Sequence, residues 1–121
     1  MFMCTVVIKQ HSWVKLFDMV DVVKNNLDKI NSVCKQYGVK SLYLFGSATN
    51  GDFNDQSDID FLVEYYRDEE GIAANGFDYF DVLFSLEQIT GRKIDLVVNG
   101  AVRNPFFKQK LDEQKVLLYA A

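Results

Sequence analysis

The spacing of apolar residues along the chain predicts its helices. Between Asp18 and Tyr37 these residues fall three or four positions apart, which is the period of one buried helical face. Gly38 follows as a residue suited to end that helix. The same period predicts a helix over Phe77–Thr90, with Gly91 after its last turn. Its expected buried stripe consists of Phe77, Phe80, Leu83 and Phe84, with Leu86 as a further candidate.

Short runs of β-branched and aromatic residues predict the strands between these helices. They span 41–45, 58–64 and 93–98, and the tail at 116–119 predicts a short fourth strand. Asn104 and Pro105 are typical of the N-cap and the first residue of a helix, here over 106–113. Helices and strands in this order predict an α/β (α+β) domain in which helices pack against a small mixed sheet.

A chain of 121 residues has room for one compact domain. We place this domain at residues 18–121 and treat residues 1–17 as an N-terminal extension to which we assign no role. The polar, turn-rich stretch 46–57 joins the first two strands. Residues 67–76 are expected to form a surface loop.

The charge balance limits the classes of molecule that the protein is expected to bind. Thirteen Lys and Arg residues against 17 Asp and Glu residues leave a net charge of −4, whereas a direct nucleic-acid binder normally carries a basic surface. The apolar residues 1–8 are too few to cross a bilayer and lack a signal-peptide pattern. Cys4, Cys34 and His11 make no disulfide framework and no zinc spacing. We expect a cytoplasmic protein without direct contacts to nucleic acid or membranes.

Two strands carry carboxylates where apolar residues are expected. Asp58 and Asp60 share one face of their strand, about 7 Å apart by backbone rise, and two ionised carboxylates near a core repel each other. Asp95 interrupts the next strand in the same way. A divalent cation would relieve this repulsion, and ligands that are all oxygen favour magnesium or manganese over zinc.

If these two strands are neighbours, the three carboxylates can hold two metal ions about 4 Å apart, an arrangement that promotes phosphoryl displacement. The alternative is that they are helix caps or strand-edge charges, which suits Asp58 better than Asp60 and Asp95.

Gly46 and Ser47 stand where the first strand ends. Glycine permits a close backbone approach, and a short helix that begins at Ser47 would point free N–H groups at a phosphate.

At this point the chain resembles a known family. Gly46-Ser47, ten residues and then Asp58-x-Asp60 are similar to the signature of the DNA polymerase β-like nucleotidyltransferase superfamily. The phrases at 44–52 and 57–63 resemble its minimal nucleotidyltransferase (MNT) branch, and Asp95 lies where that branch carries a third carboxylate. The resemblance covers about residues 40–120.

The resemblance implies the polymerase β-like nucleotidyltransferase fold and the transfer of a nucleoside monophosphate, with ATP as the expected donor, to an acceptor hydroxyl. It implies that Gly46, Ser47 and Asn50 bind the nucleotide. Asp58, Asp60 and Asp95 are the implied catalytic residues. Asp58 and Asp60 would bind two magnesium ions, and Asp95 would bind the ion nearest the acceptor.

One position departs from the family pattern. The branch often has a basic residue where Asn50 stands, and Asn50 supplies hydrogen bonds without positive charge. The basic residues that would have to replace that charge are Lys40, Arg92, Lys93 and Arg103.

MNT proteins of this size are similar to antitoxins that are paired with HEPN-domain toxins. The resemblance therefore implies a HEPN-domain partner, encoded nearby, on which a tyrosine receives AMP. The main alternative is a non-catalytic module of the same fold that neutralises its partner by occlusion. A stand-alone adenylyltransferase of small molecules would need an acceptor pocket for which 121 residues leave little room.

Most aromatic residues, Phe106 and Phe107 among them, are expected in the core. Aromatic residues that the core does not need would line an interface, so the formation of a homo-oligomer stays an open alternative.

Overall fold

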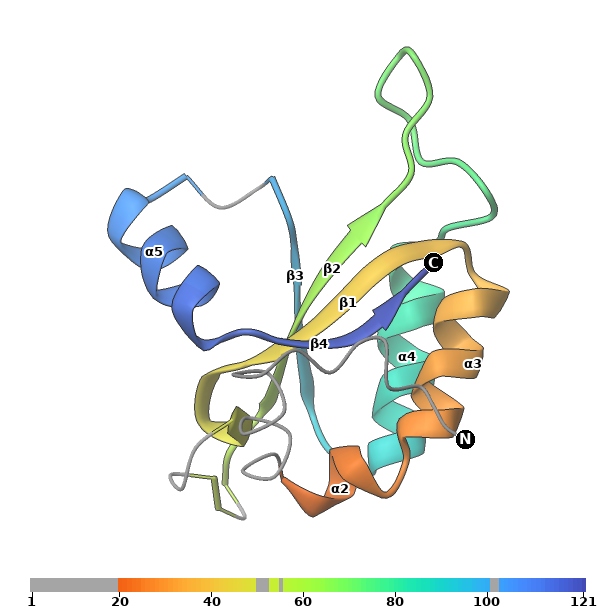
Figure 1. Cartoon of the computed structure of the whole chain (residues 1–121). Helices are drawn as coiled ribbons and strands as arrows, with labels where there is room; N and C mark the ends of the chain where they lie inside the picture. Colours follow the sequence, from red (N-terminus) through yellow and green to blue (C-terminus); the bar gives the residue numbers. More distant parts are fainter. Residues whose placement is uncertain (1–19, 50–52, 55, 101–102) are drawn as a thin grey trace.

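A computed structural model describes residues 20–49, 53–54, 56–100 and 103–121 (Figure 1). The expected extension at 1–17 and the predicted nucleotide-binding residue Asn50 lie outside these residues and stay predictions. Across the described residues the helices and strands follow the predicted order. None of the helices there has the length and apolar character needed to cross a membrane.

The four strands form one mixed sheet in the order β3-β2-β1-β4. β1 (Val39–Phe45) runs antiparallel to both β2 (Ile59–Tyr65) and β4 (Val116–Ala120). β2 and β3 (Ile94–Val98) run parallel. Parallel neighbours need a crossover connection, and α4 (Tyr79–Thr90) supplies it. Among the described residues, β3 and β4 are the edge strands of this sheet.

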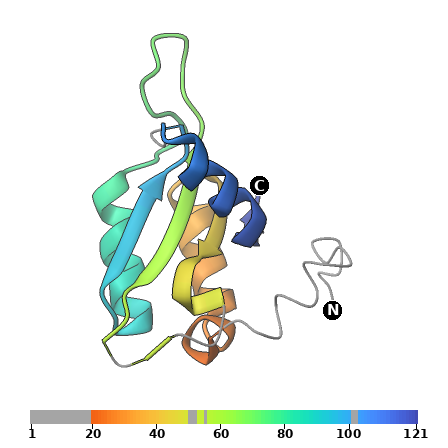
Figure 2. The same ribbon diagram turned by 90° about the vertical axis from the view of Figure 1, so that its left-hand side faces the viewer.

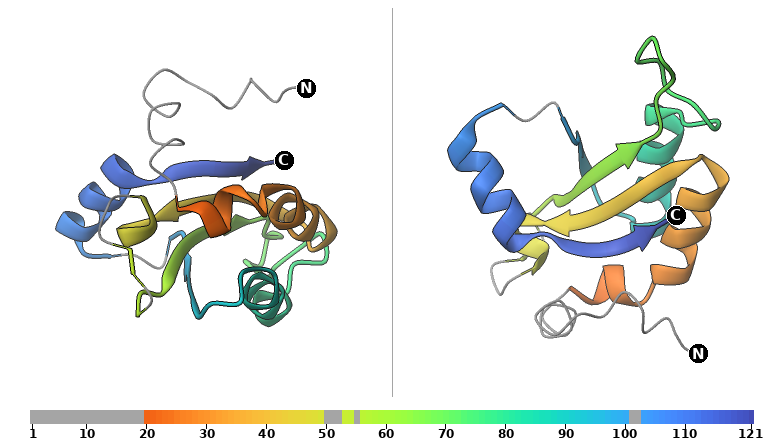
Figure 3. Two further views of the ribbon diagram at one scale, coloured as in Figure 1. Left: turned by 90° about the horizontal axis from the view of Figure 1, so that it is seen from below. Right: turned by 45° about the horizontal axis from the view of Figure 1, so that its top comes forward.

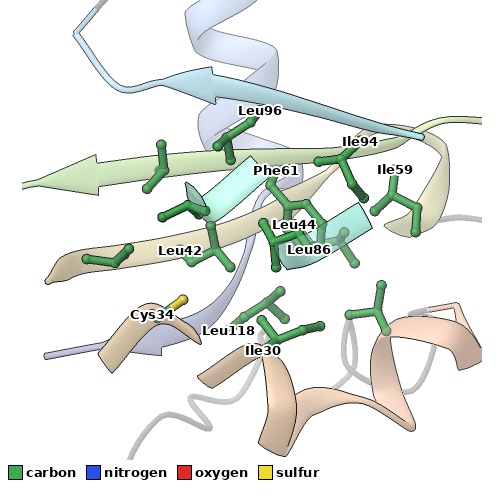
Figure 4. Close-up of a cluster of buried hydrophobic side chains, with 14 of the residues drawn as sticks. Ile30, Cys34, Leu42, Leu44, Ile59, Phe61, Leu86, Ile94, Leu96 and Leu118 are labelled. Carbon is green, nitrogen blue, oxygen red and sulfur yellow. The ribbon is translucent and has the colours of Figure 1, made fainter. Parts of the chain in front are cut away.

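Helices lie on both sides of the sheet (Figures 1 and 3). α2 (Asp21–Lys24), α3 (Leu27–Gln36) and α4 pack against one face. α5 (Pro105–Gln114) lies on the other side. The main core fills the space between the first face and its helices, and Figure 4 shows its buried members, which include Ile30, Cys34, Leu42, Leu44, Phe61 and Leu86.

A smaller apolar cluster lies under α5 and consists of Phe45, Leu62 and Leu111. Alternate residues of a strand share one face. Asp60 therefore lies on the same face of β2 as Leu62, and Asp95 lies on the same face of β3 as Val97, which packs against the smaller cluster. The α5 side of the sheet thus carries the carboxylates.

The predicted helix over Asp18–Tyr37 is wrong in its continuity, because its described part contains two helices. α2 ends at Lys24 and α3 begins at Leu27, with Asn25 and Asn26 between them. The Nδ2 of Asn26 donates to the backbone oxygen of Val22 at 2.7 Å. Such side-chain hydrogen bonds compete with the regular helical pattern, which explains the break.

The buried stripe predicted for α4 and the residues before it is wrong in part: Leu86 is buried and Phe77 and Leu83 are half-buried against the main core, but the other two members are not. Phe80 and Phe84 are 61% and 58% exposed. Val82 and Thr90 are buried in their place, together with Leu86. These three residues lie four positions apart and so form one face of the helix. α4 has two apolar faces, and the sheet packs against the one without the phenylalanines.

The predicted turn residues have the expected conformations. Gly38 and Gly91 have φ angles of 66° and 67° after α3 and α4. The side-chain oxygen of Asn104 accepts hydrogen bonds from the backbone N–H groups of Phe106 and Phe107 at 2.9 and 3.2 Å, which caps α5 as predicted. Contrary to expectation, the side chains of these two phenylalanines are 81% and 45% exposed, since α5 has a single buried residue.

The segment 67–76 is the predicted surface loop, and it projects beyond the sheet (Figure 1). A β-bridge between Arg67 and Ala73 closes it. At its base, the rings of Tyr65 and Phe77 stack with centroids 4.2 Å apart. The loop is thus braced where it leaves the domain.

Candidate active site

Asp60 and Asp95 lie side by side on the neighbouring strands β2 and β3. They are direct partners in the parallel register, and both project from the α5 side of the sheet. This confirms that the two strands are neighbours, which the predicted carboxylate cluster required. Their metal-binding and catalytic roles stay predictions.

The environment of Asp60 opposes its ionisation. Burial raises its pKa from the ordinary value of 3.8, and the negative charges of Asp95 and Asp58 and a hydrogen bond with the Asp95 side chain raise it further, to about 6 in total. Asp95 itself is exposed. The site is therefore a carboxylate pair with one half-buried and one accessible member.

Gly46 brings the end of β1 against this pair. Its φ angle is +73°, in the left-handed region that glycine adopts without strain. A Cβ at this position would overlap the Oδ2 of Asp60 and lie 3.2 Å from its Cγ. Only a glycine therefore allows both the turn and the observed position of the carboxylate.

The predicted short helix after β1 is a 3₁₀ helix, η2 (Gly46–Thr49). Thr49 Oγ1 donates to the backbone oxygen of Gly46 at 2.7 Å. The backbone N–H of Val20 donates to the backbone oxygen of Ala48 at 3.0 Å. These contacts hold the turn in which Ser47 is half-buried.

Asp58 is exposed and comes one residue before β2 begins, so it lies at the strand end and not within the strand as predicted. Arg92 braces the segment that leads to it. The Nη2 of Arg92 donates to the backbone oxygens of Asn54 and Ser57, each at 2.7 Å. Its guanidinium carbon lies 4.5 Å from the centre of the Phe53 ring. Sequence reasoning named Arg92 only as a source of positive charge, and this bracing depends on long-range contacts that no local pattern shows.

The donor chemistry of the site fits magnesium. Magnesium prefers carboxylate oxygens and is usually bound by one or two carboxylates together with substrate phosphates. Asp60 and Asp95 supply such a pair, and their mutual repulsion is what a cation would relieve. In the described ranges, no three His, Cys, Asp or Glu side chains are grouped closely enough to hold a metal by themselves.

Tyr79 is a site neighbour that sequence reasoning did not single out. Its hydroxyl donates to the backbone oxygen of Leu96 at 2.6 Å, which ties the start of α4 to the strand that carries Asp95. Burial and the charge of Asp95 raise the pKa of the Tyr79 hydroxyl. An aromatic residue in the first turn of a helix gives no sequence signal for such a contact.

A second polar cluster lies farther along the same two strands. Glu64 accepts hydrogen bonds from the Ser41 hydroxyl and from the side-chain amide of Asn99. The backbone N–H of Asn99 also donates to the oxygen of Val63 at 2.9 Å. Both carboxylate oxygens of Glu64 are therefore engaged in holding β1, β2 and the end of β3 together.

Residues 27–118 match the family described as "Nucleotidyltransferase domain". A protein of Methanocaldococcus jannaschii, named "Putative protein adenylyltransferase", is 33% identical over 98 residues, which span 80% of this chain and 95% of that protein.

Solved structures share the fold. A chain in a crystal structure of a toxin–antitoxin with AMP-PNP has a TM-score of 0.60 and 22% identity, over 79% of this chain and 74% of that chain. A chain in the structure of a tri-AMPylated Shewanella oneidensis HEPN toxin with its MNT antitoxin has a TM-score of 0.51 and 22% identity, over 81% and 72%. The mixed sheet with helices packed against it is thus the fold of these proteins.

Proposed function

The chain belongs to the nucleotidyltransferase domain family and is a nucleotidyltransferase, and from that premise we propose that it transfers AMP from ATP to a hydroxyl group of a partner protein. The observation that carries the proposal is the pairing of Asp60 and Asp95 beside the Gly46 turn. This arrangement places two carboxylates and a glycine turn within one small area of the sheet.

In the proposed reaction, the acceptor oxygen forms a bond to the α-phosphorus of ATP. The bond from that phosphorus to the oxygen shared with the β-phosphate breaks, and pyrophosphate leaves. Gly46, Ser47 and Asn50 would bind the nucleotide, with the β- and γ-phosphates at Gly46 and Ser47. Asp95, as the accessible member of the pair, would accept the proton of the hydroxyl.

Asp58, Asp60 and Asp95, together with phosphate oxygens of ATP, would hold magnesium in this proposal. When bound, magnesium would neutralise phosphate charge and lower the pKa of the acceptor hydroxyl. The raised pKa of Asp60 supports this role, because it reflects negative charge concentrated at a half-buried position.

A protein acceptor is supported by the names of similar proteins. The Methanocaldococcus jannaschii relative is named as a protein adenylyltransferase, and in the Shewanella oneidensis complex the HEPN toxin bound to the MNT antitoxin is AMPylated. By analogy, we propose a HEPN-type toxin as the partner of this chain, a tyrosine hydroxyl as the acceptor and an antitoxin role. The toxin–antitoxin structure with AMP-PNP supports ATP as the donor.

The test is label transfer from ATP labelled on its α-phosphate, with magnesium, to proteins of the organism that encodes the chain. Wild type, Asp95→Asn and Asp28→Asn would be compared, because Asp28 is an exposed carboxylate on α3, on the other side of the sheet. We expect a labelled protein band with wild type and Asp28→Asn and none with Asp95→Asn. Equal labelling by all three proteins would contradict the proposed role of the pair.

The alternative is a module that neutralises its partner without chemistry. In that case no protein would be labelled, and Asp95→Asn would bind the partner as tightly as wild type does. Pull-down of the partner with both forms, in parallel with the labelling, distinguishes the two functions.

A further inference from the structure

The outer flank of α4 carries an exposed aromatic pair. The rings of Phe80 and Phe84 stack with centroids 6.0 Å apart and are 61% and 58% exposed. The exposure of large aromatic side chains to water is energetically unfavourable, and a contiguous exposed pair is typical of a protein–protein contact. Neither ring serves the core, which α4 reaches through its other face.

Helix periodicity places this pair on the flank of α4 that points away from α3, and α4 itself lies beside β3, the strand at this edge of the sheet. The opposite flank of α4 meets α3, where Ser85, Gln88 and Ile89 line a groove. Phe80 packs edge-on against Tyr79, with centroids 5.3 Å apart, on the side where the Tyr79 hydroxyl reaches β3. Figure 2 shows α4 beside β3 at this edge.

The helix that carries the pair and the side chain of Asp95 lie on opposite faces of the sheet, beside the same edge strand. β3 is an edge strand, and it carries Asp95 on its other face. A protein seated on Phe80 and Phe84 would reach Asp95 by extending around the edge strand β3 to the opposite face of the sheet.

The helix that carries the pair is acidic. Asp78 and Asp81 are exposed at the start of α4 and Glu87 is half-buried near its end, whereas the segment 78–90 contains no Lys or Arg. We call Phe80 and Phe84 together with these three carboxylates the α4 aromatic surface. Complementary charge favours a partner with an apolar pocket rimmed by Lys and Arg.

We propose that the α4 aromatic surface docks the acceptor protein, a basic protein of different sequence, and so presents its hydroxyl to Asp95; the acceptor role rests on the proposed function above. A second copy of the chain fits this surface less well, because symmetric contact would bring two sets of the same carboxylates together. Like charges at a contact oppose association.

The test is photo-crosslinking in the organism that encodes the chain, with the full-length protein. p-Benzoylphenylalanine would be placed at position 84 and, as a control, at position 32, because Ser32 is exposed on α3, one helical turn from Asp28. Each adduct would be identified by mass spectrometry. In the position-84 protein, Asp81→Lys would be compared with Asp28→Lys, since both residues are exposed acids in the first turn of a helix.

We expect an adduct from position 84 with a protein of net positive charge, and none from position 32. Asp81→Lys should reduce its yield about tenfold, and Asp28→Lys should leave it unchanged. An adduct with a second copy, an adduct with an acidic protein, equal adducts from both positions or no adduct from position 84 would overturn the proposal.

The same experiment separates this proposal from the proposed function. The adduct would be probed for AMP. A basic partner that is crosslinked at position 84 but carries no AMP would support the docking surface and contradict protein adenylylation. AMP on a protein that does not crosslink at position 84 would support the activity and overturn the docking surface.

Discussion

Replacement of Gly46 by alanine tests how closely the nucleotide turn and the carboxylate pair depend on each other. The added Cβ would overlap the Oδ2 of Asp60, and the backbone at this position has a φ angle of +73°. The substitution therefore changes two things at once: it strains the turn, and it displaces a carboxylate proposed to hold magnesium.

The two effects have different magnitudes. A residue with a Cβ in the left-handed region costs about 1–2 kcal/mol of stability. To restore an ordinary contact with the new Cβ, the Asp60 carboxylate must move by about 1 Å, and a misplacement of this size costs about 100-fold in rate. We expect a modest loss of stability and a large loss of AMP transfer.

Gly91→Ala is the matched control. Gly91 has nearly the same φ angle, +67°, but no atom lies within 4 Å of the position its Cβ would take. The strain is thus similar, and no carboxylate has to move. Urea denaturation would measure the free energy of unfolding of both variants, and label transfer from ATP would measure their activity.

We expect both variants to lose about 1–2 kcal/mol of stability and only Gly46→Ala to lose about 100-fold in transfer. If Gly46→Ala transferred AMP at the wild-type rate, the contact between the turn and Asp60 would have no role in the reaction. Equal activity losses in both variants would mean that backbone strain, and not the position of the carboxylate, is responsible.

Three further predictions concern stability and positioning. The folded-state pKa of Asp60 is about 6 against 3.8, so the folded state binds more protons between these values and the free energy of unfolding should fall as pH rises from 4 to 6. In metal-free urea titrations, Asp60→Asn should show a smaller fall, and an identical pH dependence would contradict the raised pKa. Arg92→Gln should lower AMP transfer about tenfold, because it releases the segment before β2. The control Arg67→Gln should leave the transfer rate unchanged, and equal transfer rates in the two variants would contradict the bracing role of Arg92. Asn104→Ala should cost about 1 kcal/mol in urea denaturation, and an unchanged midpoint would exclude the cap.

Local patterns were sufficient for much of the fold. Every strand was predicted to within two residues at each end, because apolar runs bounded by Gly, Asn and polar residues are local features. The caps at Gly91 and Asn104 were predicted for the same reason. The sequence does not predict the pairing of β2 with β3, and the carboxylate cluster could only be made conditional on it. The register of Asp60 with Asp95 depends on hydrogen bonds between strands whose paired residues are 35 positions apart.

The errors arose where two patterns competed. α4 has apolar residues on two faces, and the period of 3.6 does not say which face the sheet covers. In the structure Val82 and Leu86 are buried against the sheet, whereas Phe80 and Phe84 are exposed. The break at Asn26 arose because its side chain bonds to the backbone within a helical period that remains intact. The overlap between Gly46 and Asp60 is a tertiary contact that the Gly-Ser motif suggests but does not locate.

The most direct test of nucleotidyl transfer compares three forms of ATP, labelled on the α-phosphate, on the γ-phosphate or in the adenine ring. Each would be incubated with the protein, magnesium and the partner protein, and the proteins would then be separated and their label measured. Transfer of AMP predicts label on the partner from the α-phosphate and adenine forms, none from the γ-phosphate form, and loss of all label in Asp60→Asn. Label from the γ-phosphate form, or no labelled protein with any form, would contradict it.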